Sequence, residues 1–379
     1  KQNKVQWSVE SNTSVGKLLT SGLENVIKDF TKFLDMSKNS KYLIKLFNDA
    51  YLKHESLTEA TRYLVNELFG EYGLVIIDGD DKLLKKQFAP FVENELVNQT
   101  SFKQVSNTIE QLKNEYKIQV NPREINLFYL TDKLRSRVIF EGGIYKVVDT
   151  DLSWTKDEII KHLYEFPERF SPNVIMRPLY QEVILPNLCY VGGGGELAYW
   201  FELKNYFEAV KVPFPILLLR NSALLITEKQ LQKAKKLNIS IDELFLNQDV
   251  LVNKKIKEVS EIEIDFSKQK TALKKQFEDL KEMAKKTDKS FIGAVNAQEA
   301  KQIKGLEVLE KRLLKAQKRK LNDLVERIKL LQNELFPNQS LEERHRNFSE
   351  IYENYGDGLI PKLINTLDPL KSEFYCITL

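Results

Sequence analysis

The spacing of apolar residues changes in the last third of the chain, and this change restricts the fold more than any other feature. From Phe266 onward, apolar residues follow at Leu273, Phe277, Leu280 and Ala284, in steps that alternate between four and three near the end. Almost every residue between them is charged or polar, which is typical of a coiled-coil seam. The chain therefore divides into a part that precedes this pattern and a helical part that carries it.

A second apolar series follows a break at residues 285–295. It comprises Leu306, Leu309 and Leu313, and later Leu321, Leu324, Ile328, Leu331 and Leu335. The two parts of this series are out of heptad phase across residues 317–320, as an inserted stutter produces. We expect a long antiparallel helical hairpin that ends at Phe336 and Pro337. Its apolar stripe favours self-association, because a two-helix hairpin alone buries little surface.

The second series is also rich in basic residues. Between Lys301 and Glu334 there are ten Lys or Arg residues against five Asp or Glu residues. One interpretation is the solvated face that any coiled coil carries. The alternative is a scaffold or RNA-binding protein, whose phosphate contacts would run along Lys315, Lys318, Arg319 and Lys320.

Composition limits the number of domains, the class of partner and the compartment, but it does not decide between these alternatives. A chain of 379 residues exceeds one typical core, so two or three domains are expected. The net charge of +3 is too mild to indicate a nucleic-acid partner, and no apolar run is long enough to predict a membrane span. Two cysteines, Cys189 and Cys376, argue against a disulfide framework and for a reducing, cytoplasmic compartment. Cys189 lies in an apolar run, which favours a buried thiol over a nucleophile.

The part before the coiled coil contains helix and strand patterns in alternation. From Thr58, as capping residue, apolar positions recur on one helical face until Gly70 ends the pattern. The run Leu74–Ile77 that follows is continuously apolar, which predicts a strand covered on both faces, as in a parallel sheet. Helix and buried strand together are half of a βαβ unit.

Three aspartates follow that strand. Asp78, Asp80 and Asp81 would lie at its carboxyl end, where open α/β sheets bind ligands. They fit either a polar turn that caps the next helix or a metal or ribose contact.

Further strands are predicted downstream. Residues 125–130 and 136–148 read as strands, the latter folded into a hairpin at Gly142 and Gly143. Residues 173–185 and 213–226 read as strands or short helices, and residues 373–379 predict at most an edge strand. The resulting fold class is α/β, a parallel core bordered by antiparallel structure.

Four consecutive glycines, Gly192, Gly193, Gly194 and Gly195, interrupt this α/β region. Leu197, Trp200, Phe201 and Phe207 follow with the spacing of one helical face, so the glycines should lead into a helix N-terminus. Consecutive amides before a helix form a pocket for anions, and glycine lets a ligand approach the main chain. A flexible connector is the alternative, but linkers are usually padded with polar residues.

Polar side chains surround the glycines. Arg177 lies between Met176 and Pro178, and its guanidinium needs either Glu182 or an anionic ligand as partner. Arg220 ends an apolar run and could join Arg177 in clamping a carboxylate or phosphate. The other candidate substrate-binding residues are Tyr180, Gln181, Glu182, Asn187, Tyr190, Glu196, Tyr199, Trp200 and Ser222. His54, His162 and His345 lack metal-ligand spacing, so no metal is predicted.

Three blocks of sequence carry a resemblance. Residues 60–81, 119–130 and 170–200, the last containing "RPLYQEVILPNLCYVGGGGELAYW", resemble the bacillithiol-synthesis family BshC. The resemblance runs through essentially the whole chain, coiled coil included. It implies a Rossmann-like core similar to nucleotidylyltransferases and class I aminoacyl-tRNA synthetases, connecting subdomains, and a coiled coil that forms a homodimer.

The function that the resemblance implies is the last step of bacillithiol synthesis, in which a ligase adds cysteine to glucosaminyl malate. Activation would use ATP or another nucleotide. Malate would then suit Arg177 or Arg220, and the glycine amides with Asp78 would bind the nucleotide or another anion. An alternative enzyme is a nucleotidyltransferase acting on another small carboxylic acid.

The same resemblance predicts the domain organisation. We expect a helical connecting segment at 1–57, the Rossmann-like core at 58–253, the coiled coil at 254–340 and a segment returning to the core at 341–379. Family members begin with a further segment bearing a "TGHQ"-like motif, which this sequence lacks. We expect catalytic residues there, and therefore a chain that is inactive alone.

Overall fold

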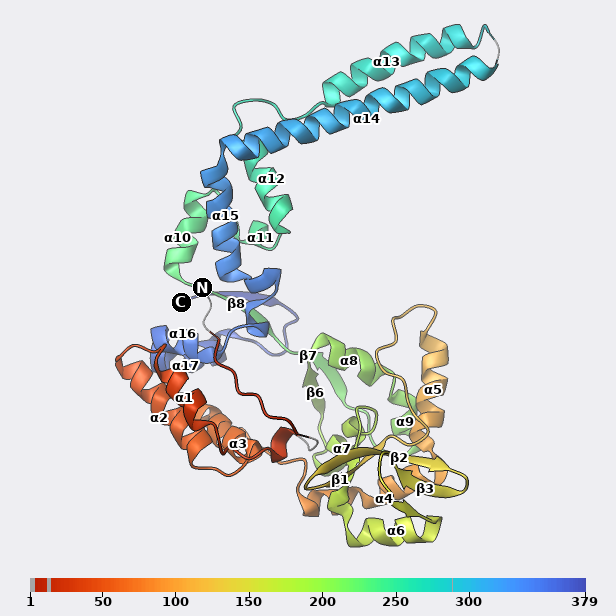
Figure 1. The fold of residues 1–379 in the computed structure, drawn as a ribbon, viewed down its shortest axis with the longest axis vertical. Coiled ribbons are helices and arrows are strands. Elements are labelled where there is room, and N and C mark those ends of the chain that lie inside the picture. The colour runs from red at the N-terminus through yellow and green to blue at the C-terminus, as the bar shows by residue number, and fades with distance from the viewer. Residues whose placement is uncertain (1–3, 12–14, 288) are drawn as a thin grey trace. The chain divides into compact units, whose positions relative to one another are not determined.

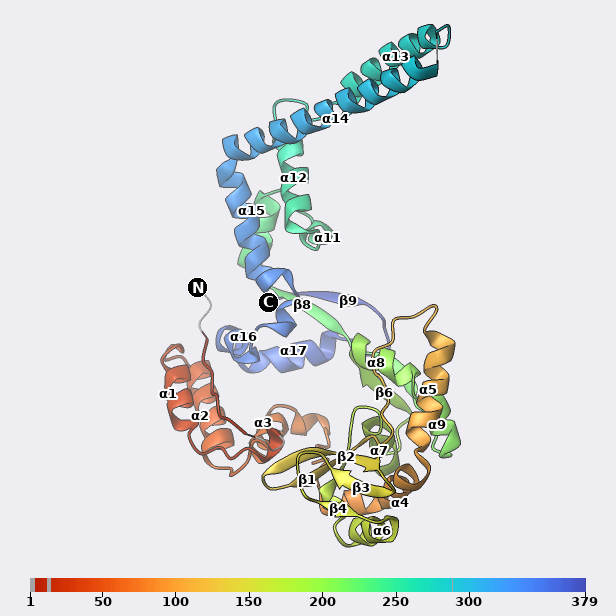
Figure 2. The ribbon, with the colours of Figure 1, turned by 45° about the vertical axis from the view of Figure 1, so that its right-hand side comes forward.

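The computed structural model describes residues 4–11, 15–287 and 289–379, and these form two compact units (Figures 1 and 2). The first unit comprises Lys1–Asn221 and Phe348–Glu373, and the second comprises Ser222–Asn347 and Phe374–Leu379. The finer division into four parts that the sequence suggests stays a prediction. No helix in the described ranges is both long and apolar enough to cross a membrane.

The first unit begins with a helical layer. Its helices are α1 (Glu24–Thr31), α2 (Lys38–Leu52), α3 (Leu57–Phe69), α16 (Phe348–Tyr355) and α17 (Leu359–Thr366). Tyr42 of α2 stacks on Tyr352 of α16 with ring centroids 5.2 Å apart, so helices from the two halves of the sequence meet in this layer. The predicted cap of α3 was two residues late, because Ser56 and Glu59 form the capping box and Thr58 lies inside the helix.

The predicted buried strand at Leu74–Ile77 is wrong. No described residue pairs with this segment, which has no regular secondary structure and lies outside any sheet. Leu74 is 47% and Val75 79% exposed, so the apolar run is not covered on both faces. A strand needs ladder partners as well as apolar residues, and the pattern alone cannot supply them. The predicted helix end is confirmed, since α3 stops at Phe69 before Gly70.

An antiparallel sheet and its helices form the next layer. The helices are α4 (Lys82–Asn98), α5 (Thr100–Leu112) and α6 (Lys156–Glu165), and the strands are β1 (Leu127–Thr131), β2 (Leu134–Glu141), β3 (Ile144–Val147), β4 (Ser153–Trp154) and β5 (Phe170–Pro172). The strand order is β4-β3-β2-β1-β5, with every neighbour antiparallel. The predicted hairpin is confirmed: Gly142 and Gly143 turn it with φ of 61° and 85°, which favours glycine.

A parallel βαβ unit completes the first unit. It contains α7 (Arg177–Ile184), β6 (Cys189–Gly192), α8 (Gly194–Phe201), α9 (Lys204–Ala209) and β7 (Ile216–Leu219). Strands β6 and β7 pair in parallel, from Cys189 with Ile216 to Gly192 with Leu219. The predicted single helix after the glycines is two helices: Trp200 and Phe207 are buried in the core, whereas Phe201 is 58% exposed.

The second unit has a small parallel sheet surrounded by helices. Its elements are β8 (Ser222–Ile226), β9 (Phe374–Thr378), α10 (Glu228–Lys236), α11 (Ile241–Leu244), α12 (Gln248–Val259) and α15 (Asn322–Leu335). The edge strand predicted at the C-terminus is confirmed as β9, which pairs with β8. Ile256 of α12 and Ile328 of α15 are fully buried in one core cluster. Single 3-10 turns are η1 (Val15–Lys17), η2 (Gly70–Tyr72), η3 (Pro167–Arg169), η4 (Pro337–Gln339), η5 (Glu342–Arg344) and η6 (Gly356–Gly358).

The helical hairpin consists of α13 (Ser267–Ala284) and α14 (Lys289–Lys320), which lie side by side in Figure 1. Residue 288 of the predicted break lies outside the described residues. Phe277, Ala284 and Val295 form the seam. Ion pairs add to it, at 2.5 Å between Lys270 and Glu310 and 2.6 Å between Lys281 and Glu299.

The predicted hairpin was too long. The helix breaks at Leu321, whose φ and ψ are −105° and 33°, and α15 then packs into the second unit's core. The loss of heptad phase at residues 317–320 therefore marks the end of a helix instead of a stutter. Leu280 and Leu309 are 42% and 51% exposed, so they lie outside the seam.

Candidate functional site

The candidate site centres on Arg177, the first residue of α7. Its guanidinium donates to the Gln181 side-chain oxygen at 3.0 Å and to the Tyr199 hydroxyl at 2.7 Å. Burial opposes the charge of Arg177, but Tyr199 and Tyr190 oxygens outweigh it and hold the pKa above its usual value. Arg177 therefore stays cationic among neutral partners.

Glu182 does not pair with this guanidinium. It is 4% exposed, and its carboxylate accepts from the Asn187 main-chain N–H at 3.1 Å and from the Asn187 side-chain amide at 3.0 Å. Burial raises the pKa of Glu182, while the two bonds from Asn187 lower it. In the described part of the chain no carboxylate forms an ion pair with Arg177, so its charge is available to an anionic ligand.

The glycines take three different positions. Gly192 ends β6, Gly193 caps α8, and Gly194 and Gly195 open its first turn. A Cβ at Gly192 would lie 2.6 Å from the Tyr190 ring, whereas one at Gly195 would meet nothing within 4 Å. Close packing therefore requires glycine at position 192. Position 195 has free space for a side chain.

Two charged side chains flank this turn. The Gly193 N–H donates to Glu196 at 2.9 Å, which satisfies one donor of the helix end. Arg220 lies on the other side, with Nε 3.7 Å from the position that a Cβ of Gly193 would take. Its main-chain N–H also donates to the Gly192 oxygen at 2.9 Å. The helix N-terminus and Arg220 are thus adjacent, a combination that suits a carboxylate or phosphate.

Two stacked aromatic rings lie beside Arg177. Tyr190 stacks on Trp200 with ring centroids 4.2 Å apart, and Trp200 is fully buried. The indole N–H of Trp200 has no hydrogen-bond partner within the described ranges. Because Tyr190 also interacts with Arg177, this stack fixes one side of the guanidinium.

Tyr180 connects α7 to the aspartate turn. Its hydroxyl donates to the Gly79 main-chain oxygen at 2.9 Å, and the turn is closed by a 2.9 Å bond from the Asp80 N–H to the Asp78 carboxylate. Asp81 caps α4 through the N–H groups of Leu83 and Leu84, as the polar-turn interpretation predicted. A ligand contact for Asp78 stays a prediction.

Lys85 holds the same turn and was missed by the sequence analysis. It is 4% exposed, forms an ion pair with Asp80 and donates to the Glu168 main-chain oxygen at 2.9 Å. Burial lowers the pKa of Lys85, although Asp80 opposes this shift. The only available signal was its position four residues after Asp81, and charged helix positions usually face solvent.

Ser222 begins β8 and belongs to the second unit, whereas the other candidate residues belong to the first unit. His54 and His162 belong to the first unit and His345 to the second. In the described ranges no group of three His, Cys, Asp or Glu side chains is placed to hold a metal ion.

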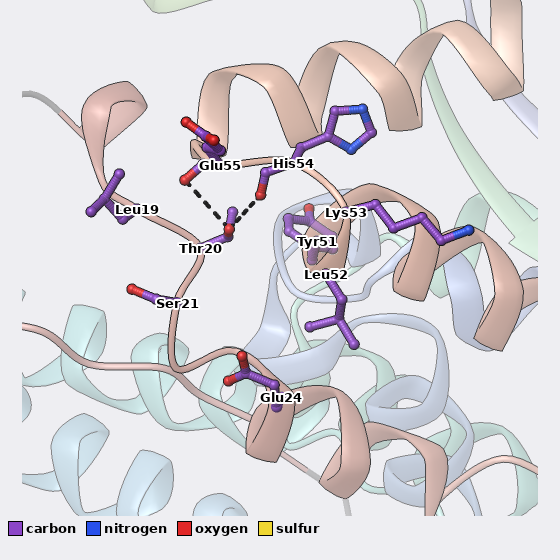
Figure 3. A pocket seen from close by; sticks show the side chains of 9 residues that line it. All are labelled: Leu19, Thr20, Ser21, Glu24, Tyr51, Leu52, Lys53, His54 and Glu55. Carbon is purple, nitrogen blue, oxygen red and sulfur yellow. Dashed lines mark hydrogen bonds between the residues drawn. The ribbon is translucent and has the colours of Figure 1, made fainter.

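A cavity lies elsewhere in the first unit (Figure 3). It measures about 410 Å³ and is lined by Leu19, Thr20, Ser21, Glu24, Tyr51, Leu52, Lys53, His54 and Glu55. The Thr20 hydroxyl lies against the main-chain oxygens of His54 and Glu55, as Figure 3 shows. None of the candidate site residues lines this cavity, so it is separate from the candidate site.

Two family models match this chain, and the boundary between them falls close to the boundary between the two structural units. Residues 1–221 match the family described as bacillithiol biosynthesis BshC, N-terminal Rossmann-like domain, and residues 223–379 match bacillithiol biosynthesis BshC, C-terminal coiled-coil domain. The chain belongs to the BshC family. The Rossmann-like fold and the coiled coil that the sequence predicted are therefore confirmed.

Individual BshC relatives agree over almost the whole chain. A protein of Christiangramia forsetii is 59% identical over 97% of this chain and 68% of its own length. A protein of Flavobacterium johnsoniae is 56% identical over 100% of this chain and 72% of its own length. A protein of Cytophaga hutchinsonii is 37% identical over 97% of this chain and 68% of its own length. All three carry the name "Putative cysteine ligase BshC". All candidate residues except Ser222 fall within the part that matches the Rossmann-like domain of BshC.

Proposed function

We propose that this BshC-family chain is a ligase that joins the carboxyl group of cysteine to the amino group of glucosaminyl malate. The name that its relatives carry supports the cysteine ligase activity. The observation that carries the substrate assignment is Arg177, a partly buried guanidinium whose protein partners are neutral. A malate carboxylate would supply the missing negative charge through a bidentate, charge-assisted pair.

Eight of the candidate residues have a role in this proposal. Arg177 binds a malate carboxylate, and Tyr199 and Gln181 hold the guanidinium in place by the bonds described above. Arg220 and the N–H groups of Gly194 and Gly195 bind a second anionic group, either a phosphate or a carboxylate. The Tyr190–Trp200 stack supplies a rigid apolar wall.

Amide formation from a free carboxylate needs activation, and we propose ATP or another nucleotide as the activator. The cysteine carboxylate would attack the α-phosphorus, forming an acyl-nucleotide bond and releasing pyrophosphate. The glucosaminyl amine would then attack the acyl carbon, losing its proton to solvent, and release the nucleoside monophosphate. The support is the position of Arg220 beside the α8 N-terminus, a combination that favours an anion, together with the Rossmann-like fold, which is an argument by analogy.

The test is calorimetric titration of glucosaminyl malate, and separately of ATP, into the chain and into Arg177→Ala and Arg177→Lys. Loss of a charged hydrogen bond costs about 1.5–3 kcal/mol, so we expect Arg177→Ala to weaken malate-conjugate binding at least tenfold. Arg177→Lys should keep part of the binding, because lysine retains the positive charge but lacks the paired N–H donors of the guanidinium. Arg135→Ala is the matched control, since Arg135 is an exposed arginine over the Phe128 ring. Equal binding by the native chain and Arg177→Ala would refute the assignment.

We also propose that the hairpin forms a homodimer in the cytoplasm. Met283, Phe291, Val308 and Leu309 are between 44% and 63% exposed on α13 and α14, more apolar surface than a lone two-helix hairpin normally presents to water. A second copy would cover these side chains. Light scattering of the native chain against a Met283→Lys and Leu309→Lys double variant tests this, and an unchanged mass would count against the dimer.

A further inference from the structure

A row of basic side chains runs along one face of α14. With 3.6 residues per turn, six exposed Lys and Arg residues fall on an arc of about 100° around the helix axis. We call them the basic stripe, which consists of Lys301, Lys304, Lys311, Arg312, Lys315 and Arg319. At 1.5 Å of rise per residue, the stripe is about 27 Å long.

No acidic residue lies on this arc between residues 293 and 319. The remaining positions on the arc are occupied by Gly293, Ala294, Ala297 and Val308. Glu299 and Glu310 lie on the opposite side of the helix. There they form ion pairs with two lysines of α13, Lys281 and Lys270. The basic stripe therefore faces away from α13, the helix that lies beside α14 in Figure 1.

The charges of the basic stripe are not neutralised by carboxylates. Among the residues that the structure describes, no acidic side chain forms an ion pair with a stripe residue. Two other lysines near the end of α14 differ, since Lys318 lies 3.9 Å from Asp249 and Lys320 lies 3.4 Å from Glu261. Both of these lysines lie outside the arc. The unneutralised positive charge of this part of α14 is thus gathered on one face.

Such a face favours a ligand that carries many negative charges. Like charges three or four residues apart on a helix, as at Lys311, Lys315 and Arg319, repel each other. A polyanion that lies along the helix would relieve this repulsion at every stripe residue. The net charge of +3 does not oppose this, because it is an average over the whole chain.

The composition of the arc distinguishes between polyanions. A helix that lies on a membrane inserts an apolar face, but the apolar residues Ile292 and Val295 of α14 pack against α13. Single-stranded nucleic acids are held by stacking of their bases on aromatic rings, and the arc contains no aromatic residue. A duplex presents rows of phosphates on a rigid rod, which basic side chains alone can bind. The basic stripe therefore fits a duplex best.

We propose that the basic stripe binds a nucleic-acid duplex through its phosphodiester backbone, without reading the base sequence. The stem of an RNA and double-stranded DNA share this chemistry. Of the four residues named above for phosphate contacts, Lys315 and Arg319 take part, whereas Lys318 and Lys320 do not. This binding is independent of the proposed ligase reaction, because the stripe belongs to the second unit and Arg177 to the first.

The stripe and the proposed homodimer use mainly different residues. Phe291 and Leu309 lie about 110° from the centre of the stripe, beside the seam with α13. Val308 is the one residue of the proposed dimer surface that lies on the arc. A duplex on the stripe therefore leaves most of the dimer surface uncovered.

Fluorescence anisotropy on the native chain tests the proposal. The probes are an RNA duplex of about 20 base pairs, which is longer than the stripe, a DNA duplex of the same sequence and one strand of the RNA alone. We expect both duplexes to bind with dissociation constants of about 1–100 µM at physiological salt. The logarithm of the binding constant should fall with the logarithm of the salt concentration, with a slope of about −5 for six phosphate contacts. The single strand should bind at least fivefold more weakly.

A pair of triple variants places the binding on the stripe. One variant removes three stripe charges by Lys304→Gln, Lys311→Gln and Lys315→Gln. The matched control removes three exposed charges elsewhere in the hairpin by Lys274→Gln, Lys275→Gln and Lys286→Gln. We expect the stripe variant to bind the duplexes at least tenfold more weakly and to lower the salt slope by about 3. The control should change the slope by less than about one.

The outcomes separate this proposal from its alternatives. A preference for the RNA or the DNA duplex identifies the source of the phosphates and supports the proposal. Equal losses in the two variants, tighter binding of the single strand, or no duplex binding at low salt would overturn it. Tighter binding to phosphatidylserine vesicles than to either duplex would assign the stripe to a membrane surface instead. A stripe variant that loses the dimer mass in light scattering would assign the stripe to self-association.

Discussion

The Tyr180 hydroxyl donates a 2.9 Å hydrogen bond to the main-chain oxygen of Gly79, and this bond joins α7 to the aspartate turn. Arg177 begins the same helix three residues earlier, so the guanidinium and the turn are held by one rigid element. Burial strongly raises the pKa of Tyr180, with the three turn aspartates adding to the shift, so the hydroxyl keeps its proton.

Tyr180→Phe should therefore lower the free energy of unfolding by about 1 kcal/mol, because the Gly79 oxygen loses its donor while the ring packing remains. Urea denaturation measures the loss. Tyr164→Phe is the matched control, since its hydroxyl donates to Glu93 at 2.6 Å on the surface, where water can replace the bond. A larger loss in Tyr164→Phe than in Tyr180→Phe would contradict the structural role of Tyr180.

Gly192, at the end of β6, and Gly195, in the first turn of α8, should respond in opposite directions to alanine. Gly192→Ala places a Cβ 2.6 Å from the Tyr190 ring and should cost roughly 1–3 kcal/mol of stability through overpacking. Gly195→Ala meets open space inside a helix and should stabilise the chain by about 0.4–1 kcal/mol. Thermal unfolding of both variants measures the two signs.

Ligand binding adds a second readout for Gly195→Ala. If the Gly194 and Gly195 amides bind an anion, the added methyl group should weaken ATP or glucosaminyl malate in the stabilised variant. Stabilisation without any change in the affinity for either ligand would leave the glycines as packing elements and remove them from the proposed site.

Local patterns predicted the local structure well. The hairpin at Gly142 and Gly143, the helix after the glycines and the seam around Phe277 all depend on residues near one another in sequence, so spacing and turn chemistry suffice. The helix end at Gly70 belongs to the same class.

Features that depend on distant partners could not be predicted. Leu74–Ile77 has the composition of a strand but no ladder partner in the described part of the chain, and heptad spacing in α15 fits a globular core as well as a coiled coil. In the candidate site, the residue types were evident, but which acceptor Arg177 uses depends on how α7 meets α8. Buried Lys85 illustrates the same limit, because its partners lie on two other elements.

His162 should make the first unit sensitive to mild acid. Tyr129 lies between Arg169, whose guanidinium is 3.2 Å from its hydroxyl, and Nε2 of His162 at 2.8 Å. Since Arg169 can only donate, the hydroxyl donates to an unprotonated Nε2. Burial, reinforced by Arg169, lowers the pKa of His162 below its usual 6.5, although Glu165 and Glu168 oppose the shift.

The sign follows from proton binding. The unfolded chain binds the His162 proton more readily, so stability falls as pH drops below about 6.5 and levels off below the lowered folded pKa. His162→Phe keeps the stacking on Trp154, whose ring centroid is 5.1 Å away, and should remove this part of the slope. Unfolding free energies between pH 7 and pH 5 measure it, with His345→Gln as the control that keeps the slope. An unchanged slope in His162→Phe would disprove the assignment.

Glu243 should contribute stability that acid removes. Its side chain pairs with Lys254 at 2.7 Å and Lys255 at 2.9 Å and caps α11, and these bonds lower its pKa from 4.5 to about 2. Because the folded chain binds this proton more weakly, the stabilisation is complete above about pH 4.5 and is lost as pH falls toward 2. Glu243→Gln should therefore cost roughly 1–3 kcal/mol at pH 7, with the difference from the native chain shrinking between pH 4.5 and pH 3. Chemical denaturation at several pH values measures the gap, and Glu263→Gln, on an exposed pair with Lys268, should show almost none. A gap that stays constant down to pH 3 would mean that the carboxylate charge is not what stabilises this corner.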